Sequence, residues 1–138
     1  MKFQSHPFFD GNPAVSEWMY LRPDDWTELE PGPEKALQDL LRAHKPWLCE
    51  LALDRIRAAA GEDYLTERPF PWVKDFLFYP IGQRGYRVYV EYFFYQKPDE
   101  NSPDSDFWWV IINCPEAIPP FSTGRREAIV IGLGWWVL

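Results

Sequence analysis

The second half of the chain consists of short apolar-rich runs separated by turn signals, a pattern typical of strands. Glycines at positions 82 and 85 bracket one connection, and residues 99–106 form another that is rich in Asn, Ser, Pro and Asp. These connections are too short for crossover helices, so consecutive strands are expected to be antiparallel neighbours. The predicted strands cover residues 72–79, 86–97, 107–114 and 127–138.

The first half of the chain is expected to be largely helical. In residues 33–43 the apolar side chains share one face and the charged side chains lie opposite them. Pro46 interrupts this pattern, because it lacks a backbone N–H and clashes with the preceding turn. It equally suits the first turn of a second helix that ends before Gly61. We therefore expect two helices or one kinked helix over about residues 33–60, and we leave residues 13–21 open between helix and strand.

This order of elements predicts an α+β fold, in which a helical N-terminal half packs on a four-stranded antiparallel meander. A sheet curled around a long helix, as in cystatin-like and NTF2-like proteins, is one arrangement of these layers. Such an analogy of layers does not fix function. A chain of 138 residues has the length of one domain, which we expect to span residues 1–138.

The strand expected over residues 86–97 has two unlike faces. Its even positions from Tyr86 to Phe94 are all apolar, and we assign them to the core beneath the helices. Its odd positions alternate aromatic rings with charges and point away from the helices. The next strand is apolar on both faces. We therefore expect the outer face of the sheet to be covered by the N-terminal 30 residues, by the connection over residues 115–126 or by another molecule.

The last predicted strand places Gly132 and Gly134 two residues apart on one face. Glycines inside a strand mark a bend, a bulge or the close approach of another group. We favour a structural role over a binding groove: the glycines let the sheet curl or accommodate a neighbouring ring. The candidate rings are those of Tyr89, Phe93, Trp108 and Trp109. The opposite face carries larger side chains and is assigned to the core: Ile129, Ile131, Leu133, Trp135 and Val137.

Composition and charge narrow the classes of partner. The formal net charge is −7 and the 14 Lys and Arg residues are scattered, which argues against nucleic acid, because phosphate binding needs a basic face. An acidic protein is better suited to a basic protein partner. Cys49 and Cys114 do not form a disulfide framework, and no apolar run is long enough to span a bilayer. We expect a cytoplasmic protein with free thiols and no membrane association.

Chemical motifs are sparse. The sequence has no metal-ligand spacing, nucleophile constellation or phosphate loop, so we predict no catalytic residue, no metal and no cofactor. His44 and Cys49 could form an imidazole and thiol pair, but nothing supplies a third orienting group, and we interpret His44 as a helix-end histidine. Arg55 projects into the apolar side of the second helix, where an unpaired charge is costly, and Glu91 or Asp75 is its expected partner.

Two functions remain open, and the first is a non-catalytic acidic protein that binds another protein through the aromatic face of the sheet. Inhibitor and immunity proteins are examples of this type. Self-association is a variant, because the last strand is apolar and could pair across a two-fold axis. The candidate interaction face comprises Arg87, Tyr89, Glu91, Phe93, Tyr95 and Trp136.

The second function is a small-molecule-binding protein or enzyme with a pocket between the sheet and the helix. Convergence of several polar side chains would mark such a pocket. Nothing in the sequence names a substrate for it. The candidate polar groups are His44, Arg55, Glu91 and Tyr92.

Overall fold

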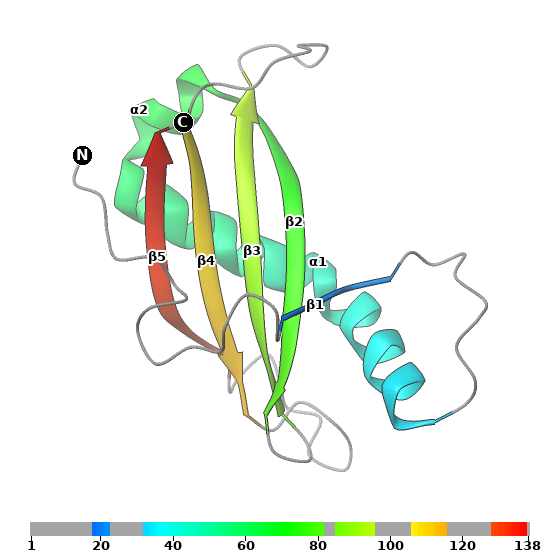
Figure 1. The fold of residues 1–138 in the computed structure, drawn as a ribbon. Coiled ribbons are helices and arrows are strands. Elements are labelled where there is room, and N and C mark those ends of the chain that lie inside the picture. Colours follow the sequence, from blue (N-terminus) through cyan, green and yellow to red (C-terminus); the bar gives the residue numbers. More distant parts are fainter. Residues whose placement is uncertain (1–17, 23–31, 82–84, 96–105, 116–127, 138) are drawn as a thin grey trace.

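A computed structural model describes residues 18–22, 32–81, 85–95, 106–115 and 128–137. In this part of the chain five strands form one open antiparallel sheet, in the order β1-β2-β3-β4-β5, and a long helix crosses one face of it (Figure 1). The predicted α+β class is confirmed, with five strands rather than four, because a two-residue strand precedes the helix. The elements are β1 (Met19–Tyr20), α1 (Pro33–Ala60), α2 (Glu62–Glu67), β2 (Phe70–Ile81), β3 (Gly85–Tyr95), β4 (Asp106–Cys114) and β5 (Ile129–Val137).

Helix α1 runs through Pro46 without ending, so the predicted helical region forms one helix. Its far end is closed by Gly61, which has a φ of 92° and donates its N–H to the carbonyl of Arg57 at 2.9 Å. A proline in a helix interior costs about 3 kcal/mol. Leu41 before Pro46 and Leu48 after it are both fully buried against the sheet. Packing on both sides of the proline therefore offsets its cost.

The inner face of the sheet, which α1 covers, carries the larger of two hydrophobic clusters. On β3 the even positions from Tyr86 to Phe94 all belong to it, as predicted. The helix contributes side chains such as Leu48, Ala52 and Ile56, which are spaced four residues apart and so share one face. We call this set the inner cluster, and it comprises Leu37, Leu41, Leu48, Ala52, Ile56, Phe76, Phe78, Tyr86, Val88, Val90, Tyr92, Phe94, Trp108, Val110, Ile112 and Cys114.

The opposite face carries a second cluster, which is smaller and more aromatic. Part of its cover comes from Trp18, which lies just before β1 and within the N-terminal 30 residues. Strand β4 contributes side chains to both clusters, so the prediction that both of its faces are covered is confirmed. We call this set the outer cluster, and it comprises Trp18, Leu77, Tyr89, Trp109 and Ile111.

A β-bulge in β5 shifts the alternation of its side chains. Gly132 and Val130 pair with adjacent residues of β4, which leaves Ile131 as an extra residue. Val130 therefore packs on the inner cluster together with Leu133, whereas Ile129 and Ile131 are 59% and 47% exposed. The prediction that Ile129 and Ile131 belong to the core was wrong, because it assumed an unbroken period of two.

The two glycines of β5 lie under the indole ring of Trp109, as predicted. A Cβ atom on Gly134 would overlap that ring, and one on Gly132 would lie 3.1 Å from it. The glycines therefore have a structural role, because only a residue without a side chain lets the indole lie flat on the strand.

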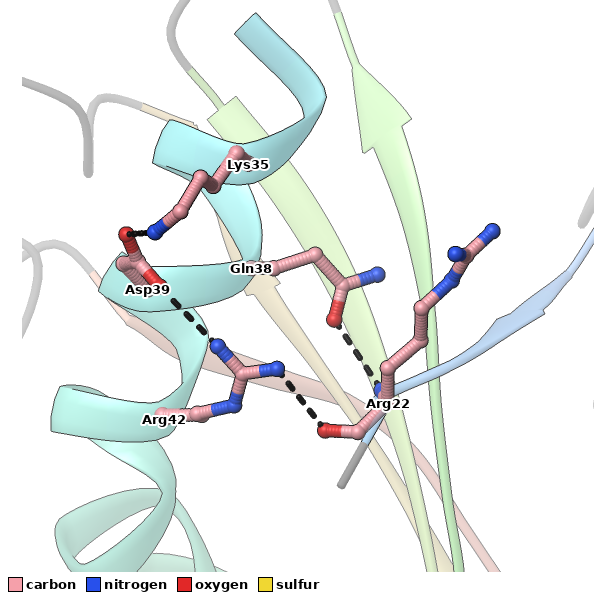
Figure 2. A network of polar contacts seen from close by, with 5 residues as sticks. All are labelled: Arg22, Lys35, Gln38, Asp39 and Arg42. Carbon is pink, nitrogen blue, oxygen red and sulfur yellow. Dashed lines mark hydrogen bonds and ion pairs between the residues drawn. The ribbon is translucent and has the colours of Figure 1, made fainter. Parts of the chain in front are cut away.

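A network of polar contacts fastens the segment after β1 to α1 (Figure 2). The backbone N–H of Arg22 donates to Gln38 Oε1 at 3.0 Å, and the Arg42 guanidinium donates to the carbonyl of Arg22 at 3.1 Å. Arg42 also donates to Asp39 at 2.9 Å, and Lys35 donates to the same carboxylate at 2.7 Å. These contacts hold β1 at the edge of the sheet. Of residues 13–21, which we left open between helix and strand, Met19 and Tyr20 form a strand, and residues 13–17 lie outside the described part.

Candidate functional site

The outer face of β3, which the sequence predicts as an interaction face, is mostly covered by the chain itself. Tyr89, Glu91 and Phe93 are only 4%, 7% and 6% exposed. Trp18 lies against Tyr89, with ring centroids 6.2 Å apart, and Trp109 packs in the same cluster. The middle of this face is therefore a second core and not a free surface.

Glu91 is a buried carboxylate next to the outer cluster. Tyr89 Oη donates a hydrogen bond of 2.6 Å to Glu91 Oε2, and Lys74 Nζ lies 3.4 Å from Oε1. Burial raises the pKa of Tyr89, and the Glu91 carboxylate raises it further, so the phenol stays protonated and remains a donor. A buried carboxylate loses its hydration and is stabilised only if other groups replace the lost hydrogen bonds. Tyr89 and Lys74 supply such interactions to Glu91.

Lys74 is a member of this site that the sequence did not predict. It is the extra residue of a β-bulge in β2, between Val73 and Asp75. Its Nζ lies 5.1 Å from the ring centroid of Phe93 and 6.0 Å from that of Phe107. An ammonium group at such distances is attracted to the face of an aromatic ring. The bulge reverses the alternation of β2 at this point, but no feature of the local sequence marks Lys74 as the inserted residue, so its place beside Glu91 could not be predicted.

The exposed part of the outer face lies where β2 begins and β3 ends. Trp72 is 51% exposed and stacks on Phe93, with ring centroids 6.1 Å apart and planes 17° apart. Tyr95 lies 6.2 Å from Trp72, and Phe93 meets Phe107 edge-on at 5.7 Å. Phe70, 38% exposed, pairs with Tyr95 in the register of β2 and β3. We call this set the aromatic corner: Phe70, Trp72, Phe93, Tyr95 and Phe107.

Three members of the aromatic corner were missed as site residues. Phe70 and Trp72 stand at alternate positions before the start of the apolar run in β2, which was a usable signal. Their placement beside Tyr95 and Phe93 depends on the bulge, which shifts the register of β2 by one residue. Phe107 could not be assigned to a face, because β4 is apolar on both faces.

The remaining predicted members of the interaction face lie in different places. Arg87 lies nearer the other end of β3 and donates through Nε to Asn113 Oδ1 at 3.4 Å. Trp136 pairs with Phe107 in the register of β4 and β5, and the side chains of Trp136 and Val137 lie outside the described part. Of the five predicted residues whose side chains are described, Phe93 and Tyr95 belong to the corner, whereas Tyr89 and Glu91 are buried in the middle of the face. Arg87 lies apart from both groups.

The four polar groups predicted to line a pocket do not converge. His44 Nδ1 lies 2.7 Å from Tyr86 Oη, and Tyr92 Oη donates to a backbone carbonyl of α1 at 2.9 Å, both on the inner face. Glu91 lies on the outer face, beyond the sheet. Arg55 is exposed on α1 and does not lie in an apolar environment, because the sheet covers only one side of the helix.

The imidazole and thiol groups of α1 do not form an activated pair. Burial lowers the pKa of His44 and raises the pKa of the Cys49 thiol. Burial also raises the pKa of Cys114 to about 12. The raised pKa values keep both cysteines in the thiol form at neutral pH, which is less nucleophilic than the thiolate. The hydrogen bond of His44 goes to Tyr86, in keeping with its interpretation as a structural histidine.

A surface hollow of about 400 Å³ lies between the end of α1, α2 and the start of β2. A hollow of this size could hold a small ligand. Arg57 and Arg68 line it, and each lies close to a carboxylate of its own helix region, at 3.0 Å and 3.4 Å respectively. None of the four predicted pocket groups is among its lining residues.

No protein-family model, curated protein or solved structure matches this chain. The likeness to cystatin-like and NTF2-like proteins therefore extends only to the packing of a helix on an antiparallel sheet. Within the described ranges no three His, Cys, Asp or Glu side chains gather as metal ligands would. None of the described helices is long and apolar enough to cross a membrane.

Proposed function

We propose that this chain is a non-catalytic protein that binds another protein through the aromatic corner. The observation that carries the proposal is the Trp72 ring, which is half exposed and yet held against Phe93 and beside Tyr95. A large ring that is already fixed contributes apolar contact area at a small cost in side-chain entropy. Trp and Tyr are enriched among the residues that dominate binding energy in interfaces.

The residues around Trp72 support this role because they make the corner rigid. Phe93 is buried, contacts Phe107 edge-on and has the Lys74 ammonium near its ring. Lys74 itself is partly exposed, so a charged group borders the apolar rings. An apolar centre with a polar rim is the common arrangement of protein interfaces.

The charge of the chain indicates the kind of partner. At a formal net charge of −7 it would attract a basic protein over long range, which speeds association and makes it sensitive to salt. The two cysteines are free, which suits a reducing compartment, and we place the protein in the cytoplasm.

The proposal is tested by capture with matched variants. The immobilised chain is exposed to an extract of the organism that produces it, and the retained protein is identified and purified for affinity measurement. We expect Trp72→Ala to weaken binding about 30-fold, because loss of a dominant interface residue costs at least about 2 kcal/mol. The control is Tyr20→Ala, which removes an aromatic ring that is also more than half exposed, from the short strand β1.

Circular dichroism and thermal unfolding of each variant establish that the fold is retained. If Trp72→Ala holds the same protein with the affinity of the unmodified chain, the aromatic corner is not the binding surface. Loss of binding in Tyr20→Ala alone would move the surface to the β1 edge and equally contradict the proposal.

A further inference from the structure

The two edges of the sheet differ in how they are protected. On the β2 edge Pro71 and Pro80 lack backbone donors, and Lys74 sits in a bulge. The short strand β1 pairs with another part of the same edge. Prolines, lysines, bulges and short strands are the devices by which proteins keep sheet edges from pairing with other chains. The β2 edge carries all four.

Strand β5 carries almost none of these devices. It is the last strand of the described sheet, and in the described part of the chain it pairs only with β4. Its nine residues include no proline and no charged residue. The bulge at Ile131 lies near its start and leaves the stretch from Gly132 to Val137 in regular register with β4. Ile129 and Ile131 are exposed hydrophobic side chains at this edge.

We infer that the outer edge of β5 pairs with β5 of a second copy of this chain, antiparallel across a two-fold axis. The backbone groups along an antiparallel edge are self-complementary, so two identical strands can exchange N–H and C=O bonds. Nine residues at about 3.4 Å each offer roughly 30 Å of such pairing. The two sheets join into one continuous sheet, and the contact closes on itself because each copy uses the same strand.

The distribution of charge favours a second copy as the occupant. Two copies with a formal net charge of −7 each repel one another wherever acidic side chains meet. Strand β5 brings no charged side chain to the contact, so pairing there avoids that repulsion. A basic partner, by contrast, would find no carboxylate on this strand to recognise.

Other segments of the same chain suit this edge less well. Residues 1–17 contain Pro7 and Pro13, and residues 116–127 contain Pro119 and Pro120. Neither segment has nine consecutive residues free of proline. A proline within a paired strand removes a ladder hydrogen bond, so these segments cannot match the length of β5.

The test is the mass of the full chain in solution, measured by sedimentation equilibrium over a range of concentrations. We expect twice the chain mass of 16.4 kDa, falling towards the mass of one chain on dilution. The variant Ile129→Lys with Ile131→Lys is expected to raise the dissociation constant at least tenfold, because it replaces two apolar side chains by ammonium groups at each end of the antiparallel contact. Both positions are exposed, so the fold should tolerate the change.

The matched control is Met19→Lys with Tyr20→Lys, which changes two exposed apolar residues at the opposite edge. It alters the net charge by the same amount, so a general effect of charge would appear in both variants. A full chain that keeps the mass of one copy at every concentration overturns the inference, including the case in which its own residues cover β5. A dimer that survives the β5 substitutions, or one that only the control disrupts, overturns it as well.

The outcome is separate from that of the proposed function, because Trp72 lies on β2 and two strands separate it from β5. Trp72→Ala is expected to leave the dissociation constant of the dimer unchanged.

Discussion

The two faces of the sheet are closed by elements of very different size. The inner face lies under a 28-residue helix, whereas the described cover of the outer face includes the single indole of Trp18 beside a two-residue strand. A helix covers a face along its whole length, but one ring covers only its surroundings. The exposure of side chains on the outer face therefore rises from the buried Tyr89 to the half-exposed Trp72. The candidate surface is a part of this face that is still exposed in the described structure.

The largest difference between the two faces is expected when the same ring is removed from each of them. Phe94 is fully buried on the inner face, against Tyr64 and Tyr92. We expect Phe94→Ala to lower the free energy of unfolding by about 3–5 kcal/mol, through lost transfer energy and an unfilled cavity. Phe70→Ala on the outer face should cost less than about 1 kcal/mol, because its ring is already partly in water. Urea denaturation measures both, and equal losses would mean that the two faces do not differ as described.

The inner face could be predicted because apolar residues recur at every second position along the strand that lies at its centre. The even positions of β3 are apolar from Tyr86 to Phe94, and the strands were located to within about two residues. The helix was located equally well, although its continuation through Pro46 was not determined. That question depended on whether Leu41 and Leu48 both pack on the sheet, which is a tertiary contact that local sequence does not contain.

The outer face could be predicted only in part, because two bulges break the period. Lys74 in β2 and Ile131 in β5 are each one extra residue in their strand. Beyond each bulge, odd and even positions exchange the face of the sheet on which their side chains lie. The alternation of rings and charges on β3 was interpreted as a surface. Glu91 can nevertheless be buried there, because Tyr89 donates to it and the bulge brings Lys74 within 3.4 Å.

Removal of Trp18 tests how far the outer cluster depends on a single ring, and its effect on stability is expected to be smaller than that of Phe94→Ala. We expect Trp18→Ala to lower the free energy of unfolding by about 2–3 kcal/mol, below the usual loss for a central ring, because Trp18 lies at the border of the sheet. The near-ultraviolet circular dichroism should also change, since Trp18 contacts the rings of Tyr79 and Tyr89. Tyr20→Ala is the control and should cost less than about 0.5 kcal/mol, because its ring is exposed. A loss no larger than that of the control would show that the outer cluster does not depend on Trp18.

The smallest expected effect concerns His44, a polar group at the border of the inner face. Burial lowers its pKa in the folded chain, so between that pKa and the ordinary value of about 6.5 the unfolded chain binds more protons than the folded one. The contribution of His44 to the free energy of unfolding is therefore fully present above the ordinary pKa. It is lost as the pH falls from that value through the lower pKa of the folded chain. Tyr86 supports the neutral imidazole, because its phenol stays protonated and can donate to Nδ1.

We expect His44→Asn to flatten the dependence of the unfolding free energy on pH between about 5 and 7, measured by urea denaturation at several pH values. His6→Asn reports the contribution of the other histidine of the chain in the same assay. If the slope for His44→Asn equals that of the unmodified chain, His44 is as accessible in the folded state as in the unfolded one. The inner face would then be open to water beside Tyr86, and the contrast between a closed inner face and a graded outer face would not extend to that end of the helix.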